Sequence, residues 1–343
     1  MHFSRPFGIS GPTLWLPERR QSASEAVRQG LIDSETAEEL GHSALPVADQ
    51  AAPDLAVEAA RRALADAGLD AGSVALLLHA WIHYQGHDLW SPPHYIADRL
   101  DADAATPIGI QQVCNGGAAA LELAAARLLA EPELGAALIT TADRFADPGF
   151  DRWSGDYGIG YGDGATALVL HDPGLRPADL LLHSIATVAA PQLERMHRGD
   201  DPFGPAPRSI SERVDVRRTK KAFLQAEGIE GFGKASAEAL RRVASACLEA
   251  PALQVSGARL RYVVPPRLGR KTIDLAYAPV LGELDGAELL RVGQDTGHLG
   301  AGDLAASLAE LRSGRLLSRG EYALVVSAGA GFTWSGVLVG ATV

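Results

Sequence analysis

The order of helices and strands expected in the first half of the chain recurs in the second half, at an offset of about 180 residues. Between Asp54 and Gly68, apolar residues recur at helical spacing. This pattern predicts a helix over residues 54–68 with an aspartate N-cap and a C-terminal glycine. The apolar run 73–81 follows and is typical of a strand buried on both faces. Residues 237–243 and 260–264 repeat this helix and strand.

Two further apolar runs complete each half, 135–142 with 165–170 and 322–327 with 336–339. Helices that alternate with buried strands predict an α/β fold whose sheets lie between helix layers. Duplication is the simplest explanation of the repeated order. It divides the chain into an N-terminal half over residues 1–172 and a C-terminal half over residues 234–343. Between them, residues 173–233 contain Pro191, Pro202, Pro205 and Pro207, which predicts an inserted loop and cap.

Cys114 ends an apolar run and is followed at once by Gly116, Gly117 and three alanines, which predict a helix of small residues. A cysteine at a helix N-terminus faces free backbone N–H groups and the positive end of the helix dipole, so its thiolate is favoured. The alternative is a buried structural cysteine. Cys247, within an apolar helical pattern, is expected to be such a core residue.

Composition narrows the class of protein. The 343 residues are 47% hydrophobic, enough for a large core, and the net charge of −11 argues against a nucleic-acid binder. The chain has only two cysteines, so a disulfide framework is not expected. No signal peptide and no uninterrupted apolar stretch of about 18 residues is evident, which predicts a cytoplasmic protein without a membrane span.

The stretch 297–306, which contains His298 and Asp303, falls in the second half where the Cys114 turn and helix fall in the first. A pseudo-dyad between the halves brings equivalent corners together. The repeat therefore predicts that Cys114 and His298 share one site. Alternatively, His298 is a loop histidine bonded to backbone, and Asp303 is a helix N-terminal charge favoured by the dipole.

Four stretches, in this order and spacing, resemble the thiolase superfamily, specifically ketoacyl-ACP synthase III and its relatives. They are the Cys114 turn with its small-residue tail, the glycine-rich run 158–167, the 297–306 corner, and residues 329–334. The resemblance covers essentially the whole chain. It implies a thiolase fold, in which duplicated α/β halves form a five-layered α-β-α-β-α arrangement, and it implies a homodimer.

The chain departs from the condensing members of that family at their catalytic histidine and asparagine. Pro266 stands at the histidine position and His298 at the asparagine position, while Asp303 replaces a small residue. Decarboxylative condensation needs two neutral donors for the enolate, and this chain lacks that set. Cys114, His298 and Asp303 are instead a nucleophile, base and orienting acid of the kind that acyl transfer uses.

The resemblance implies an acyltransferase of polyketide or antibiotic biosynthesis. It would move an acyl group from an acyl-carrier-protein or CoA thioester, through acyl-Cys114, to a hydroxyl or amine of a sugar or aminocyclitol intermediate. No cofactor is expected beyond the phosphopantetheine of the donor. Two alternatives stay open: a starter-unit ketosynthase III that condenses despite Pro266, and a non-catalytic partner that binds the carrier protein.

Further site residues follow from the resemblance. The oxyanion hole is expected at the backbone N–H groups of Cys114 and of Ala330 or Gly331, although that glycine loop can also be a tight turn with positive φ. Arg267, Arg270 and Lys271 are expected to dock the acidic carrier protein and its phosphopantetheine. A second basic cluster is the alternative dock, and it comprises Arg208, Arg213, Arg217, Arg218, Lys220 and Lys221.

An aromatic loop containing His83, Tyr84 and Trp90 is expected to line the acyl pocket or the dimer contact. His83 and His87 are four residues apart, a spacing that metal-binding helices use. However, the prolines that follow do not favour a helix and no cysteine lies nearby, so no metal site is predicted.

Overall fold

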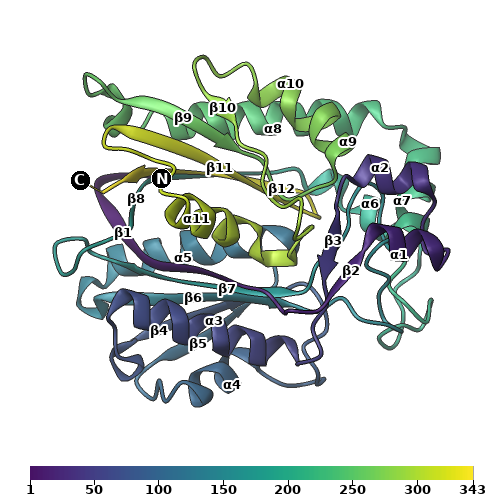
Figure 1. The fold of residues 1–343 in the computed structure, drawn as a ribbon, viewed down its shortest axis with the longest axis horizontal. Helices are drawn as coiled ribbons and strands as arrows, with labels where there is room; N and C mark the ends of the chain where they lie inside the picture. Colours follow the sequence, from purple (N-terminus) through teal and green to yellow (C-terminus); the bar gives the residue numbers. More distant parts are fainter. Residues whose placement is uncertain (343) are drawn as a thin grey trace.

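The computed structural model describes residues 1–342, in which two similar α/β halves share one ten-stranded sheet (Figure 1). The N-terminal half contributes five strands in the order β1-β7-β6-β4-β5. Their bounds are β1 (His2–Trp15), β4 (Leu76–Ala80), β5 (Thr106–Ile110), β6 (Ala136–Asp143) and β7 (Gly164–His171). The C-terminal half contributes β8-β12-β11-β9-β10. These are β8 (Leu180–Ala189), β9 (Arg259–Val264), β10 (Glu288–Leu289), β11 (Glu321–Gly329) and β12 (Thr333–Ala341).

The two strand orders are the same when β1, β4, β5, β6 and β7 are matched to β8 through β12 in chain order. The halves meet where β1 pairs antiparallel with β8, for example Phe7 with Leu182. The repeated order predicted from the sequence is therefore present as a structural duplication with a pseudo-dyad at the β1–β8 pair.

Helices cover and separate the two halves of the sheet. In Figure 1, α3 (Ala52–Ala67) covers the outer face of the N-terminal half and α8 (Glu230–Leu248) covers the outer face of the C-terminal half. Between the two sheet layers lie α5 (Gly116–Ala130) and α11 (Asp303–Ser313). The predicted five-layered α-β-α-β-α arrangement is confirmed.

The central layer is built from small residues because two helices and two sheets meet there. On α5 the buried positions include Gly116, Gly117, Ala118 and Ala120, and its neighbour α11 buries Ala305. These side chains join one apolar cluster with strands of both halves. The segment Val113–Ala130 has the length and composition of a membrane span, but here it forms this middle layer.

Smaller elements surround the duplicated core. A two-stranded sheet of β2 (Arg20–Ser22) and β3 (Ala44–Pro46) lies beside α1 (Ala23–Arg28) and α2 (Ser34–Leu40). Three other helices are α4 (Pro92–Arg99), α6 (Arg195–Arg198) and α7 (Val216–Glu227). After β9 come α9 (Arg270–Thr272), a π-helical turn Ile273–Tyr277 and α10 (Ala278–Leu281).

Two boundary predictions need correction. The helix α3 begins at Ala52, and its N-cap Ala51 makes no side-chain cap. Asp54 therefore lies inside the first turn, because Pro53, which lacks an N–H, suits the first helical positions. Gly68 ends the helix in the left-handed conformation as expected, with φ of 59°.

The C-terminal half also begins earlier than residue 234. Strand β8 (Leu180–Ala189) lies inside the segment 173–233, yet it pairs with both β12 and β1 and belongs to the sheet. The insertion that breaks the repeat is therefore shorter and lies between β8 and α8, where it carries α6 and α7. The prolines that suggested a longer insertion follow the strand.

Candidate active site

Cys114 lies on one helical turn, Val113–Asn115, between β5 and the start of α5. Val113 has a φ of 48°, a left-handed conformation that is disfavoured for a β-branched residue. The sharp turn presents the partly exposed Cys114 thiol to a cavity of about 400 Å³. The N-terminus of α5 directly follows, as the sequence predicted.

His298 lies on the equivalent corner of the other half, between β10 and α11. Its backbone N–H donates to Gly160 O at 2.8 Å, and its carbonyl accepts from the Gly162 N–H at 3.0 Å. Gly297 has a φ of 62°, which requires glycine in practice. The glycine-rich run 158–167 therefore holds the histidine corner by backbone pairing.

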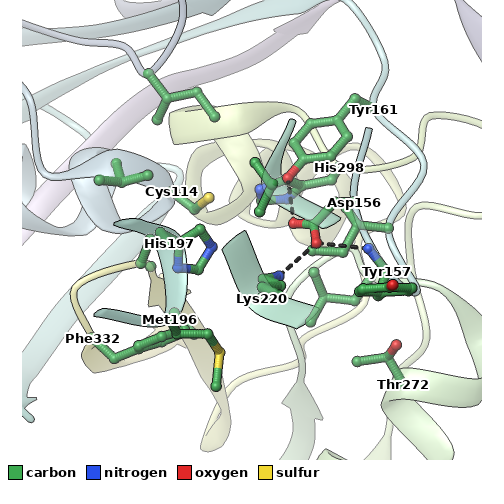
Figure 2. A pocket seen from close by; sticks show the side chains of 18 of the residues that line it. Cys114, Asp156, Tyr157, Tyr161, Met196, His197, Lys220, Thr272, His298 and Phe332 are labelled. Carbon is green, nitrogen blue, oxygen red and sulfur yellow. Dashed lines mark hydrogen bonds and ion pairs between the residues drawn. The ribbon is translucent and has the colours of Figure 1, made fainter. Parts of the chain in front are cut away.

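The two corners pack directly against each other. A Cβ on Gly117 would lie 2.5 Å from Ala301 O, and one on Gly116 would lie 3.2 Å from Ala301 Cβ. Only residues without a side chain allow this approach. As a result Cys114 and His298 line the same cavity, as Figure 2 shows, which confirms the pairing predicted from the repeat.

Asp303, the first residue of α11, orients His298. Its carboxylate accepts from His298 Nδ1 at 2.6 Å, from the Leu299 N–H at 2.8 Å and from the Arg267 N–H at 2.9 Å. Both side chains of the His298–Asp303 pair are almost completely buried. Asp303 is at the same time a helix N-terminal charge, so both interpretations of this residue hold.

The pKa values of His298 and Asp303 shift in the directions opposite to those that burial alone would cause. Burial lowers the pKa of His298, but the Asp303 carboxylate and then the charge on Cys114 raise it well above its ordinary value. Burial raises the pKa of Asp303, yet His298 and Arg267 bring it below its ordinary value. Among residues 1–342, His298 Nε2 is buried and has no partner at ordinary hydrogen-bond geometry, while the Cys114 side chain lies close enough to His298 to raise its pKa.

A buried carboxyl, Asp143 at the end of β6, connects the loop after β4 to the His298 corner. It accepts the N–H groups of Ile82 at 2.9 Å, His83 at 2.8 Å and Ala301 at 3.2 Å. Burial raises the pKa of Asp143 to about 7 although these three donors favour the carboxylate. Sequence reasoning did not identify this residue, because its partners come from two segments far from it in the chain, 82–83 and Ala301.

The loop expected to complete an oxyanion hole lies next to the nucleophile. A Cβ on Gly329 would lie 2.5 Å from the backbone nitrogen of Asn115, so the β11–β12 loop passes the Cys114 turn closely. Ala330 lines the cavity with Cys114. Gly331 has a φ of 121°, so the loop is also a turn that needs glycine. The assignment of Cys114, Ala330 and Gly331 as the oxyanion hole stays a prediction.

Arg267 is not a docking residue, because its side chain is fully buried. The guanidinium donates to Thr296 Oγ1 at 3.0 Å and pairs with Glu310 at 2.8 Å. Arg267 instead supports the site from behind through its N–H to Asp303. Arg270 and Lys271 are exposed on α9, where they pair with Glu38 and Glu39, and for these two the docking assignment stays a prediction.

The aromatic loop is divided by the structure. His83 lines the cavity, where its ring packs against Phe145 and Phe150, and burial lowers the pKa of His83 to about 4. Tyr84 and Trp90 are 51% and 37% exposed and do not line it, so their assignment to the substrate pocket is wrong. A dimer contact at this loop stays a prediction.

Three cavity residues were missed or misplaced by sequence reasoning. Lys220, expected on the surface with the basic cluster, turns inward on α7 and pairs with the buried Asp156 at 2.6 Å. His197 on α6 lines the same cavity. The spacing of Val216, Lys220 and Leu224 is a signal that could have found Lys220, because residues four apart share a helix face.

Within residues 1–342, no group of three or more histidine, cysteine, aspartate or glutamate side chains is arranged to hold a metal ion. The two cysteines are free thiols, and Cys247 is buried in the core as expected.

Comparison with known proteins places the chain among relatives of one family. Residues 108–184 match the model of 3-oxoacyl-[acyl-carrier-protein] synthase III, and residues 252–341 match the model of its C-terminal part. The β-ketoacyl-[acyl-carrier-protein] synthase III of Neisseria meningitidis serogroup C is 27% identical over 344 residues, which span 96% of this chain and 98% of that protein.

Two solved structures show the same architecture. ChlB3, described as an acyltransferase, is 31% identical with a TM-score of 0.86, over 98% of this chain and 97% of ChlB3. The 3-oxoacyl-[acyl-carrier-protein] synthase III of Aquifex aeolicus has a TM-score of 0.74 at 19% identity, over 98% of this chain and 99% of that one, a likeness of fold. The chain therefore belongs to the ketoacyl-ACP synthase III-like family of the thiolase superfamily and is an enzyme of the acyltransferase and synthase class.

Proposed function

We propose that this enzyme transfers an acyl group from a carrier-protein or CoA thioester, through an acyl-Cys114 intermediate, to a hydroxyl or amine. The observation that carries the proposal is the His298–Asp303 pair, at 2.6 Å, on the corner that faces Cys114. A carboxylate that orients a histidine beside a nucleophile is the arrangement that acyl transfer uses on unrelated folds.

In the first step the Cys114 thiolate attacks the thioester carbonyl and the pantetheine sulfur leaves. The raised pKa of His298 keeps its ring protonated beside the thiolate, and that proton then passes to the leaving sulfur. Asp303 stabilises the imidazolium through Nδ1. Backbone N–H groups at Cys114 and Ala330 would receive the developing oxyanion.

In the second step His298 acts as the base. Acylation removes the negative charge on Cys114, which is one of the causes of the raised pKa of His298, so the pKa falls and the neutral ring becomes accessible. Its Nε2 can then take the proton of an acceptor hydroxyl or amine that attacks the acyl carbonyl. The histidine returns to its protonated form as Cys114 leaves as a thiolate.

Decarboxylative condensation is disfavoured by the residues after β9. A condensing relative needs neutral donors for the enolate, and Pro266 can neither donate nor titrate. On acyl-Cys114 the neutral His298 ring donates its Nδ1–H to the ionised Asp303, so Nε2 is an acceptor and cannot donate to an enolate. This argues against the second candidate function, a starter-unit ketosynthase III, although the curated relatives carry that name.

We further propose that the acceptor is a sugar or aminocyclitol type intermediate of polyketide or antibiotic biosynthesis, and that the enzyme acts in the cytoplasm as a homodimer. The likeness to ChlB3, described as an acyltransferase, supports group transfer over condensation. A non-catalytic carrier-protein partner is a third candidate. The intact set of Cys114, His298 and Asp303 argues against it.

The test loads the enzyme with a panel of acyl thioesters and follows the mass of the intact protein. The loaded enzyme is chased with malonyl-carrier protein in one tube and with hydroxyl or amine acceptors in another. Release of the adduct only by the acceptors supports transfer, whereas release by malonyl-carrier protein with carbon dioxide would establish condensation. Cys114→Ala, which cannot form the adduct, is the control, and absence of any adduct on the parent enzyme would favour the non-catalytic candidate.

A further inference from the structure

The cavity that contains Cys114 is lined mainly by apolar and aromatic side chains. Apart from the catalytic residues, its polar lining comprises one charged group of residues and neutral side chains such as His83, Ser236 and Thr272. On one side lie Phe145, Phe150 and Tyr161, and on the other Phe332 and Trp334. An acyl group attached to Cys114 must occupy this space. A polar group in such a wall is costly unless it serves folding or a ligand.

The charged group is the ion pair of Lys220 and Asp156. Both oxygens of Asp156 accept hydrogen bonds: Oδ1 accepts from Lys220 Nζ at 2.6 Å and from the Tyr157 N–H at 2.6 Å, while Oδ2 accepts from the Tyr161 hydroxyl at 3.1 Å. Figure 2 draws these contacts at the cavity wall. The Asp156 side chain is 1% exposed and that of Lys220 is 14% exposed.

Lys220 keeps donor capacity that Asp156 does not use. An ammonium has three N–H donors, and Asp156 is the one hydrogen-bond partner that the structure gives Lys220 among residues 1–342. Two donors are therefore free in a side chain that lines the cavity. The ion pair therefore has two unused donors on Lys220, whereas its one unused acceptor site, on Asp156 Oδ2, belongs to a side chain that is only 1% exposed.

His197 adjoins this pair and is neutral. Burial and then the positive charge of Lys220 lower the pKa of His197 to about 4. Among residues 1–342, its buried Nδ1 has no hydrogen-bond partner. The ring packs against Phe332, 5.2 Å between centroids, which holds it at the cavity wall. The wall therefore has no net charge, because Lys220 and Asp156 cancel and His197 adds none.

We propose that this wall selects an acyl group that carries a neutral oxygen, a hydroxyl or a carbonyl, which accepts a hydrogen bond from Lys220. The inference rests on the proposed acyl transfer through Cys114. A carboxylate does not fit, because Asp156 already neutralises Lys220 and a second buried anion would lack a countercharge. A plain hydrocarbon chain leaves the Lys220 donors unsatisfied, so it binds less well than an oxygenated chain of the same length.

A purely structural role for the ion pair makes a different prediction. Lys220 lies on α7 of the inserted segment and Asp156 lies before the glycine-rich run, so the pair also ties the insertion to the core. Removing a structural tie weakens folding or slows every substrate equally. Removing a recognition group changes the ratio between oxygenated and plain substrates.

The experiment measures initial rates of Cys114 acylation by the mass of the intact protein. The probes are N-acetylcysteamine thioesters of hexanoate, 3-hydroxyhexanoate, 4-oxohexanoate, 5-oxohexanoate and hexanedioate, which avoid any carrier-protein docking. We expect the parent enzyme to react about tenfold faster with at least one of the three neutral oxygenated chains than with hexanoate, the effect of one hydrogen bond to a charged donor. The acid-ended hexanedioyl chain should be slower than hexanoate.

The variant Lys220→Met with Asp156→Asn removes both charges together, so neither is left unpaired. We expect the oxygenated-to-plain ratio to fall to within about twofold of unity, while Lys220→Arg, which keeps donors and charge, retains a preference. Arg241→Met with Glu283→Gln removes an exposed ion pair between α8 and the segment after α10, at 2.9 Å, and should leave the ratio unchanged.

Equal rates for plain and oxygenated chains on the parent enzyme would overturn the inference, and so would a preference that survives loss of the pair. The parent enzyme decides the matter even if the double variant fails to fold. Failure of the proposed function is distinguishable, because it would appear as no adduct on Cys114 with any probe.

Discussion

Replacing Asp303 with asparagine tests the assignment of His298 most directly. The change keeps the shape of the side chain but removes its charge and one of its two accepting oxygens. In the parent enzyme one oxygen, Oδ2, accepts from both His298 Nδ1 and the Arg267 N–H, while Oδ1 accepts from the Leu299 N–H. Asparagine cannot satisfy all three donors in either orientation of its amide.

Each orientation has a definite consequence. If the amide oxygen stays on Leu299, the amide NH₂ faces His298 Nδ1, which must then accept, so the proton moves to Nε2 and the base is lost. If the amide is reversed, the NH₂ faces the Leu299 N–H, and a buried donor without a partner costs about 1–3 kcal/mol. In both cases the imidazolium loses its countercharge, so the pKa of His298 falls.

We expect the rate of transfer from acyl-Cys114 to fall by about 10²–10⁴-fold. The lower limit corresponds to losing a strong charged hydrogen bond, and the upper limit to holding the histidine in the wrong tautomer. The assay preloads the enzyme, adds acceptor and follows loss of the adduct by mass across a pH series. The apparent pKa of the transfer rate should shift to lower pH in the Asp303→Asn variant.

Ser307→Ala is the matched control, because Ser307 Oγ bonds to the backbone carbonyl of Asp303 at 3.0 Å and leaves the carboxylate intact. It should cost about 1 kcal/mol of stability and leave the pH profile unchanged. Transfer by Asp303→Asn within about threefold of the parent rate, with the same pH profile, would refute the role of Asp303 and with it the base assignment of His298.

Three further perturbations address docking, packing and acid stability. Reversing the charges of Arg270 and Lys271 should raise KM for an acyl carrier protein but not for an N-acetylcysteamine thioester, and an unchanged, salt-insensitive KM would remove the docking proposal. In an ordinary helix, replacing glycine with alanine stabilises the fold by up to about 1 kcal/mol. Gly117→Ala should instead lower the melting temperature and the activity, because its Cβ would lie 2.5 Å from Ala301 O. A more stable, fully active variant would contradict that packing. Burial lowers the pKa of His79 from 6.5 to about 4, so the unfolded chain takes up a proton at this residue as the pH falls through 6.5 while the folded chain does not. This one group should therefore lower the free energy of unfolding by about 2 kcal/mol between pH 7 and pH 5. Denaturant titrations at both pH values in which the parent and His79→Gln lose the same stability would argue against it.

The sequence alone was sufficient for the features that depend on local pattern. Helical spacing, buried apolar runs and terminal glycines gave the order of elements, and the repeat of that order gave the duplication. The position of Cys114 at a helix start and of His298 at the matching corner followed from the repeat. Each of these needs only neighbouring residues and one symmetry between the halves.

What the sequence did not reveal depends on contacts between distant segments. Strand β8 was placed in an insertion because the prolines after it dominate the local composition, and only pairing with β1 and β12 makes it part of the sheet. Arg267 and Arg270 lie three residues apart after β9, yet the Arg267 side chain is fully buried and Arg270 is exposed.

The physical reason is the same for Arg267, Lys220 and Asp143. A charged side chain is buried only where partners from elsewhere in the chain compensate its desolvation, here Glu310 for the arginine, Asp156 for the lysine and backbone N–H groups for the aspartate. Periodicity and composition are local, so the sequence by itself determined which residues could do the chemistry and the fold that carries them. Only the tertiary structure decided which charges face solvent and which face the substrate.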